Sequence, residues 1–382
     1  MSSPMINVLL IVKRYGGDYA LVNEMARLDE RRFRCVVCYL SGERDGKNSL
    51  DDRITTYYLG LRNNEISPWN SRARKLIVDI FDKEQIHVVN CHLQRTIGLT
   101  VAAARIARRP PRLLATLHGL GSADSWKRRF GNWFIYRRLD RVIGVSEGVR
   151  QDILRNNWGL QPDKVVTIHD GIDPAPFLQL RDKEHLRQEL FPDIHAKFWF
   201  GTAGRLSKVK NQLRLLEAFR RCLRSCSESV LLLCGDGDAE RELKEHALSL
   251  GISERVRFLG FRRDIDQVLA TLDVFALPSL REGFGLALVE AMCSGVPVIA
   301  SQVGGIPEIF GETPVGELID PENTESLAAA MIRMTKLSDA ERKVLGEAAR
   351  TRVLENFTAK KMIGQYELLY EEVCRTLLPR CD

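Results

Sequence analysis

Short apolar runs alternate along the chain with longer stretches in which apolar residues recur every three or four positions. In the first half the runs are INVLLIV, CVVCYL, HVVNCHL, LLATLHG and RVIGVS, separated by helix-like stretches such as YALVNEMARL and TVAAARIARR. This alternation is typical of βαβ units that form a parallel sheet. It restarts after DGIDPAPF (170–177) with KFWFGTAGR, SVLLLCGDG, VRFLGF, DVFALPS and GVPVIAS. We therefore predict an α/β protein with two Rossmann-like domains.

The turn-rich segment 170–177 sets the predicted boundary between these domains. We assign residues 1–178 to the first domain, 179–355 to the second and 356–382 to a C-terminal helix. That last segment carries a single apolar stripe at helical spacing, formed by Phe357, Met362, Tyr366, Leu369, Tyr370 and Val373. Such a stripe needs a surface to cover it.

The nine cysteines form no regular framework, and a chain of 382 residues needs no disulfides to hold a core, which favours reduced thiols. Cys35 and Cys38 lie in a predicted strand, where positions three apart face opposite sides, and no zinc-ligand pair follows them. No run of about 18 apolar residues occurs. The N-terminus also lacks a basic stretch and a cleavage site, which predicts a cytoplasmic protein.

Positive charge is concentrated in the first half of the chain. Residues 1–180 carry 28 Lys and Arg against 19 Asp and Glu, although the whole chain has a net charge of only +6. This asymmetry predicts an anionic partner, and a membrane surface or a phosphorylated acceptor is favoured over nucleic acid because no nucleic-acid motif accompanies it.

Residues 125–141, SWKRRFGNWFIYRRLDR, interleave aromatic and basic side chains. As a helix, they place Trp126, Phe130, Trp133 and Phe134 within an arc of roughly 100°, with Arg137 inside the same arc. Two interpretations stay open: a helix that lies on an anionic membrane, and a core helix with charged flanks. The first predicts a peripheral protein at the cytoplasmic face of the inner membrane.

The stretch REGFGLALVE places two carboxylates, Glu282 and Glu290, around a Gly-Phe-Gly turn. If residues 285–292 form a helix, eight positions correspond to a rise of roughly 12 Å, too far for one acid/base pair on one bond. The span suits a nucleoside diphosphate sugar folded over the helix end, whose amides would face the diphosphate. The alternative is a pair of solvated helix residues.

The block LPSLREGFGLALVEAMCSGVPVIASQVGGIPEI resembles the donor-binding signature of retaining GT-B glycosyltransferases of glycosyltransferase family 4. Further segments follow the family pattern in order: YGG, TLHG, VIGVSEGV, GTAGRLSKVKNQ, LLLCGDGDAE, VRFLGF and FTAKKMIGQYELLY. The resemblance spans essentially the whole chain. It implies the GT-B fold, with two Rossmann-like domains that face a central cleft and a C-terminal helix that crosses back to the first domain.

The resemblance also assigns roles to residues. Arg205 and Lys210 would clamp the diphosphate and stabilise the leaving group, Glu282 would hold the donor sugar and Glu290 the ribose. The implied donor-binding set is Gly204, Arg205, Lys210, Gly235, Phe261, Glu282, Gly283, Phe284, Gly285, Leu286 and Glu290. The implied catalytic set is His118, Glu282, Arg205 and Lys210. The implied acceptor-binding set is Gly16, Gly17 and His92.

Two motifs in the second half could point to other chemistry. Asp236-Gly-Asp238 is formally the metal motif of GT-A enzymes, and Gly235-x-Gly237 begins a dinucleotide fingerprint whose third glycine is missing. The surrounding GT-B signatures disfavour both, so we predict no cofactor and no metal. Asp170 stands where the family more often has Asn, a harmless change because both residues tolerate a positive φ. The residues after Gly17 also depart from the family pattern, and this second departure leaves acceptor identity open.

The predicted function is transfer of a hexose, with retention of configuration, from a nucleotide diphosphate sugar to a lipid-linked or oligosaccharide acceptor. UDP is favoured and GDP stays open, and assembly of an envelope glycan such as a lipopolysaccharide core or a polysaccharide fits the family. One alternative is a nucleotide-sugar 2-epimerase of similar architecture. The other is a non-catalytic sugar-nucleotide-binding protein.

Overall fold

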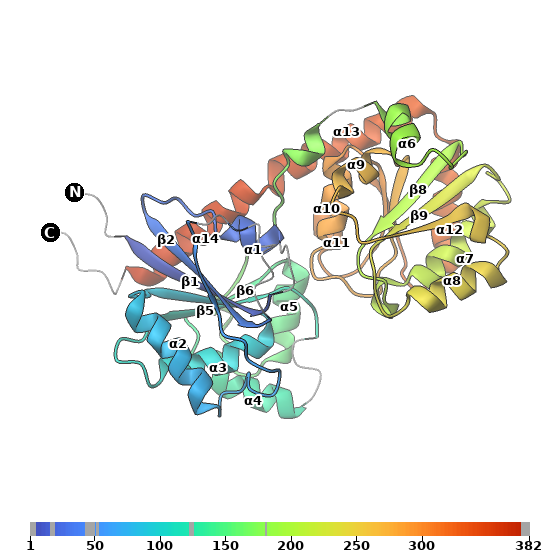
Figure 1. The fold of residues 1–382 in the computed structure, drawn as a ribbon. Helices are drawn as coiled ribbons and strands as arrows, with labels where there is room; N and C mark the ends of the chain where they lie inside the picture. Colours follow the sequence, from blue (N-terminus) through green and yellow to red (C-terminus); the bar gives the residue numbers. More distant parts are fainter. Residues whose placement is uncertain are drawn as a thin grey trace. The chain divides into compact units, whose positions relative to one another are not determined.

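The computed structural model describes residues 5–15, 20–42, 50, 53–121, 126–179 and 182–375. The chain forms two compact units, Met1–Gly171 with Ala359–Asp382, and Ile172–Thr358. Each unit has a parallel sheet flanked by helices (Figure 1), so the predicted α/β architecture is confirmed. The chain passes between the units after residue 171, whereas the sequence analysis placed this boundary after residue 178.

The first unit has a seven-stranded parallel sheet of order β3-β2-β1-β4-β5-β6-β7. Its strands are β1 (Ile6–Arg14), β2 (Phe33–Ser41), β3 (Thr55–Tyr58), β4 (Val88–His92), β5 (Arg112–Leu117), β6 (Arg141–Gly144) and β7 (Val165–Thr167). Its helices before the linker are α1 (Ala20–Met25), α2 (Ser71–Lys83), α3 (Gln94–Ala104), α4 (Trp126–Tyr136) and α5 (Glu147–Asn156). Residues 8–11 of β1 are fully buried, because helices cover both faces of the sheet.

The second unit has a six-stranded parallel sheet of order β10-β9-β8-β11-β12-β13. Its strands are β8 (Phe198–Ala203), β9 (Ser229–Cys234), β10 (Val256–Gly260), β11 (Val274–Leu277), β12 (Val298–Ser301) and β13 (Gly316–Ile319). Its helices are α6 (Lys183–Leu190), α7 (Gln212–Cys222), α8 (Glu240–Ser249), α9 (Ile265–Ala270), α10 (Leu286–Cys293), α11 (Ile306–Phe310), α12 (Thr324–Lys336) and α13 (Asp339–Asn356).

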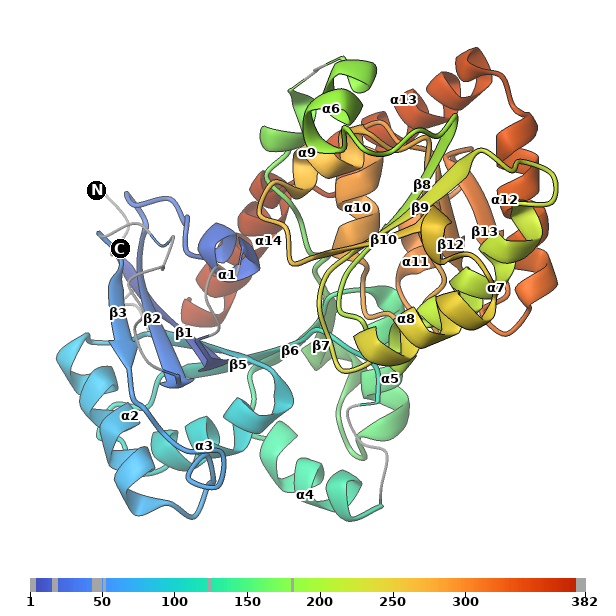
Figure 2. The same cartoon turned by 45° about the vertical axis from the view of Figure 1, so that its right-hand side comes forward.

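Helix α14 (Ala359–Cys374) belongs to the first unit and lies beside α1 (Figure 2). Tyr366 and Tyr370 are 1% exposed within the core of that unit, and the Asn90 side chain donates a hydrogen bond of 3.0 Å to the Tyr370 hydroxyl. The prediction that the C-terminal helix packs on the first domain is confirmed. Phe357 differs from the rest of the predicted stripe, because it precedes α14 and packs its ring on Phe284 of the second unit.

Among the helices that the structure describes, none is both long and apolar enough to cross a membrane. Burial raises the pKa of Cys35 and of Cys38 to about 12, so both thiols stay protonated at neutral pH. A protonated thiol is a poor nucleophile and a poor metal ligand.

Candidate functional site

In both sheets the strand order reverses at one point, and this fixes where a ligand can bind. In the second unit the reversal lies between β8 and β11, and in the first between β1 and β4. Ligands of open parallel sheets bind beyond the carboxyl ends of the strands at such a point. Arg205 follows β8, Glu282 follows β11 and His92 ends β4, so the structure places these predicted residues beside the two reversals.

The two loops that flank the reversal in the second unit are joined by main-chain and side-chain hydrogen bonds. The Leu280 amide donates to the Val209 carbonyl at 2.8 Å, and the Asn211 side chain donates to the carbonyls of Pro278 and Pro321 at 3.1 Å. Asn211 has a left-handed φ of 59°, a conformation that Asn tolerates better than most residues. The sequence analysis assigned Asn211 no role, although an Asn that ends a short basic turn is a recognisable signal.

Lys210 and Glu282 form an ion pair across these joined loops. Lys210 Nζ lies 2.6 Å from Glu282 Oε2, and the buried Ser279 hydroxyl donates to the same oxygen at 3.1 Å. Ser279 is a second residue that the sequence analysis missed. Arg205 is exposed, and in the part of the chain that the structure describes its guanidinium makes no hydrogen bond or ion pair. The loops therefore hold Lys210 and Glu282 in place and also carry the exposed guanidinium of Arg205.

The expected geometry of the two glutamates needs a correction. Helix α10 begins at Leu286, and Glu282 lies in the preceding loop, so the 12 Å rise expected for eight helical residues does not apply. Gly285 has a φ of +120°, outside the helical region, which ends the loop and starts the helix. Phe284 is 3% exposed and its ring packs on Phe357, so Phe284 and Gly285 can offer a ligand only their main chain.

Glu290 is the most perturbed carboxyl group of the predicted site. It lies on α10 with a mostly covered side chain, and loss of hydration raises its pKa from 4.5 to about 7. Loss of hydration destabilises the charged form of this carboxylate. Hydroxyl groups of a ligand that donate hydrogen bonds to it would stabilise that charge. This fits the predicted contact with a ribose.

In the folded protein Glu290 keeps its proton up to about pH 7, whereas in the unfolded chain it loses the proton near pH 4.5. The free energy of unfolding should therefore fall as pH rises from 4.5 to 7. We expect Glu290→Gln to unfold at a higher temperature than wild type at pH 8, by an amount corresponding to about 1–3 kcal/mol. At pH 4 the two proteins should unfold alike. Thermal unfolding at both pH values tests this, with Glu245→Gln, an exposed position of α8, as the control. Equal unfolding temperatures of Glu290→Gln and wild type at pH 8 would contradict it.

Three further residues of the predicted donor-binding set, Gly204, Gly235 and Phe261, lie at the carboxyl ends of β8, β9 and β10. The Gly204 amide donates to the Cys234 carbonyl at 2.9 Å, and the Gly235 amide to the Gly260 carbonyl at 2.7 Å, which holds the three strand ends together. Phe261 directly follows β10 and is 68% exposed, a position suited to stacking on a planar base. The carboxylates of Asp236 and Asp238 are exposed on the next turn.

In the first unit, His118 is held between His92 and Asp170. His92 Nδ1 lies 3.0 Å from His118 Nε2, and His118 Nδ1 lies 3.5 Å from Asp170 Oδ2. His92 is 1% exposed, and burial with the nearby His118 ring holds its pKa well below 6.5, so His92 is neutral. With this geometry His92 would act on a ligand indirectly, by orienting the His118 ring. Direct contact of either histidine with substrate stays a prediction. Gly16 and Gly17 lie outside the described residues.

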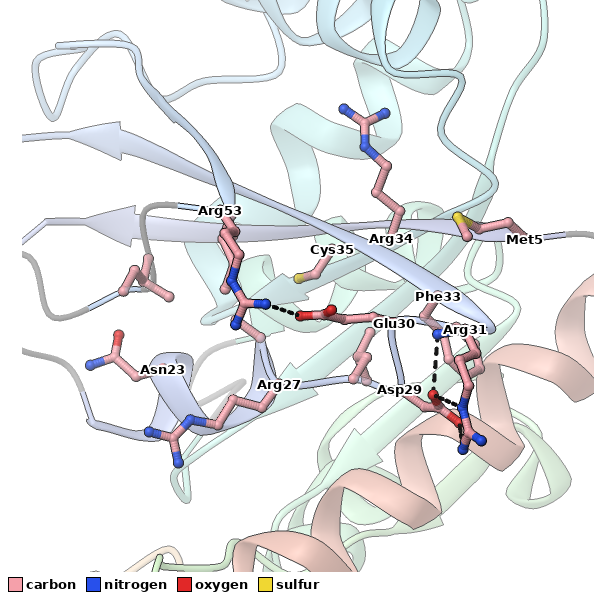
Figure 3. A pocket seen from close by; sticks show the side chains of 14 residues that line it. Met5, Asn23, Arg27, Asp29, Glu30, Arg31, Phe33, Arg34, Cys35 and Arg53 are labelled. Carbon is pink, nitrogen blue, oxygen red and sulfur yellow. Dashed lines mark hydrogen bonds and ion pairs between the residues drawn. The ribbon is translucent and has the colours of Figure 1, made fainter.

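A cavity of about 960 Å³ in the first unit lies away from these residues (Figure 3). It borders the amino ends of β1 and β2, the edge opposite to the strand ends where parallel sheets bind ligands. Its arginines pair with neighbouring carboxylates, Arg53 with Glu30 at 3.4 Å and Arg31 with Asp29 at 3.0 Å. We assign it no part in the candidate site.

Comparison with known proteins agrees with this geometry. The model of the glycosyl transferases group 1 matches residues 185–352, and that of glycosyltransferase family 4 matches residues 16–176. The chain is 30% identical to the N-acetyl-alpha-D-glucosaminyl L-malate synthase of Bacillus anthracis over 81% of its own length and 80% of that protein. It is 27% identical to the UDP-Gal:alpha-D-GlcNAc-diphosphoundecaprenol alpha-1,3-galactosyltransferase of Escherichia coli, with 84% of each chain covered.

Solved structures show the same fold. Anabaena HepE in complex with UDP and glucose superposes with a TM-score of 0.82 at 22% identity, over 96% of this chain and 100% of that one. The lipopolysaccharide outer core galactosyltransferase WaaB superposes with a TM-score of 0.72 at 15% identity, over 96% of this chain and 100% of that one. Two α/β units with parallel sheets, together with these matches, define a glycosyltransferase of the GT-B class. The chain belongs to glycosyltransferase family 4, the glycosyl transferases group 1, as its motifs predicted.

Proposed function

We propose that the protein transfers a hexose from a UDP-sugar to a hydroxyl group of a lipid-linked or oligosaccharide acceptor, with retention of configuration and without a metal ion. The Lys210–Glu282 ion pair, which joins the loop that carries Arg205 to the loop before α10, carries this proposal. Two or more positive groups stabilise the charge of a bound diphosphate. A carboxylate beside them can accept hydrogen bonds from the hydroxyl groups of the sugar. GDP is the second candidate nucleotide.

In the proposed reaction, the bond between the anomeric carbon and the donor phosphate oxygen breaks while the acceptor hydroxyl attacks from the same face. The leaving phosphate accepts the hydroxyl proton. Arg205 and Lys210 stabilise the negative charge that develops on the diphosphate, together with the main-chain amides at the start of α10. These two cations would supply the charge that a divalent metal would otherwise provide. Glu282, which orients Lys210 at 2.6 Å, would also accept hydrogen bonds from the sugar.

Two relatives support an acceptor of the cell envelope. The Escherichia coli relative is named for a diphosphoundecaprenol-linked sugar, and another relative, at 29% identity, is a Vi polysaccharide biosynthesis protein of Salmonella typhi. We infer that this protein acts in polysaccharide or lipopolysaccharide core assembly, at the cytoplasmic face of the membrane that holds such an acceptor.

The test is a donor screen followed by product analysis. UDP and UDP-hexoses should raise the unfolding temperature of the wild type more than GDP or ADP sugars do, because binding stabilises the folded state. With a polyprenyl-diphosphate sugar as acceptor and EDTA present, the active donor should give a product with the donor's anomeric configuration, read by NMR. An inverted product, or a loss of activity in EDTA that Mg²⁺ restores, would contradict the proposal. Release of a C2 epimer of the sugar would favour the 2-epimerase, and binding without turnover the non-catalytic alternative.

A further inference from the structure

Helix α4 presents a row of large aromatic side chains outward from the first unit. Trp126, Phe130 and Phe134, each four residues apart, are 67%, 53% and 49% exposed. Burial of these three rings in a domain core, one of the two interpretations of this segment, is therefore wrong. Folded proteins seldom expose contiguous apolar side chains of this size unless the surface binds something.

Phe130 and Phe134 of this row form a preformed cluster with Trp133. The rings of Trp133 and Phe134 lie 4.5 Å apart and those of Phe130 and Phe134 5.0 Å apart, in both cases edge to face. The Arg137 guanidinium lies over the Trp133 ring at 4.8 Å. A surface that is already packed loses little conformational entropy when it binds.

The opposite side of α4 fixes the helix to the rest of the unit. Tyr136 is 2% exposed, and the buried Asn132 side chain donates to Asn157 at 2.7 Å and accepts from Gln94 at 3.4 Å. Gln94 begins α3, two residues after His92. The outward aromatic row is therefore held on a rigid helix, near the strand end that carries the candidate histidines.

Every charged residue of the segment 126–138 is basic. Residues 126–138 contain five Lys and Arg and no Asp or Glu, and Arg128, Arg137 and Arg138 are exposed. Aromatic rings flanked by arginines fit the interface of an anionic bilayer, where the rings enter the headgroup region and the guanidinium groups meet lipid phosphates. An apolar protein partner would instead favour a surface depleted of charge at its centre.

We propose that α4 docks the protein on an anionic membrane, with Trp126, Phe130 and Phe134 inserted between headgroups and Arg128 and Arg138 on lipid phosphates. We call this surface the α4 face. Docking there would bring the strand ends near His92 to the bilayer, where a lipid-linked acceptor lies. Vesicle binding needs neither donor nor acceptor, so a failure to bind vesicles would leave the proposed transfer reaction untouched. A failure of the transfer reaction would likewise leave the proposed membrane docking untouched.

The experiment is flotation of the full chain with vesicles of phosphatidylcholine alone or with 30% phosphatidylglycerol. We expect wild type to float only with the anionic vesicles, and less at 0.5 M salt, because salt screens the arginines. The triple variant Trp126→Ser/Phe130→Ser/Phe134→Ser should bind at least about tenfold more weakly, because each ring removed loses its burial in the headgroup region. Arg128→Glu/Arg138→Glu should lose about tenfold or more at low salt.

Matched controls use exposed positions of the second unit. The variant Leu248→Ser/Val344→Ser removes apolar side chains that are 70% and 65% exposed. The variant Arg241→Glu/Lys343→Glu reverses two exposed charges. Both control variants should bind vesicles as wild type does. Circular dichroism verifies that each variant is folded. Absence of wild-type binding to anionic vesicles at low salt would overturn the proposal, as would a triple variant that floats like wild type. A wild-type dimer in light scattering that the triple variant lacks, without vesicle binding, would instead make the α4 face a contact between two copies of the chain.

Discussion

Replacing Lys210 with methionine is expected to lower kcat about 100- to 1000-fold, the loss that follows removal of one group that stabilises transition-state charge. The ammonium lies 2.6 Å from Glu282, on the loop that also carries Arg205, where the leaving diphosphate gains negative charge in the proposed reaction. The donor KM should change less than kcat, because that charge is larger in the transition state than in the bound donor. Initial rates with the preferred UDP-sugar measure both constants.

The control is Lys208→Met, which removes an exposed lysine from the same turn. The Glu282→Gln variant and the double variant complete a mutant cycle. Because each partner left alone keeps an unpaired charge, the double variant should lose less activity than the two single losses combined would give. A Lys210→Met enzyme within threefold of wild type would remove Lys210 from the mechanism.

Replacing Gly235 with alanine is expected to destabilise the protein by about 3 kcal/mol or more, because strain and a main-chain clash act together. Gly235 has a φ of +127°, and an added Cβ would lie 2.1 Å from the Gly204 carbonyl oxygen. That oxygen belongs to the main chain, so the only relief is to separate the strand ends that carry Arg205 and Phe261. Urea unfolding measures the loss of stability.

Gly251→Ala separates the two contributions to this loss. Gly251 also has a positive φ, +68°, but an added Cβ there would meet nothing within 4 Å. It should therefore show the conformational cost alone, about 1 kcal/mol. If Gly235→Ala and Gly251→Ala lose equal stability, the close packing of the strand ends described above is wrong.

The sequence predicted the sheets well because their strands are buried on both faces and therefore appear as continuous apolar runs. The apolar stripe of α14 was also predictable from the sequence, since Met362, Tyr366 and Tyr370 recur at helical spacing and all lie in the core. The start of α10 was predicted to within one residue, at 285 against Leu286 in the structure. The rise between Glu282 and Glu290 was not, because Glu282 precedes Gly285, whose positive φ of +120° lies outside the helix.

Contacts between distant residues of the site were beyond sequence reasoning. The Lys210–Glu282 pair joins positions 72 residues apart, and only the reversal between β8 and β11 makes them neighbours. The contact between His92 and His118 follows from the parallel pairing of β4 with β5, in which His92 is opposite Thr116. Each of these residues was predicted from its motif, but its partner depends on strand order and register.

A crystal structure of the protein with UDP would locate the nucleotide. We expect density for the diphosphate between Arg205, Lys210 and the amino end of α10, with the ribose hydroxyls on Glu290 and the base near Phe261. A nucleotide bound elsewhere, for example in the cavity at the amino ends of β1 and β2, with the carboxyl edge of the second sheet left empty, would contradict it.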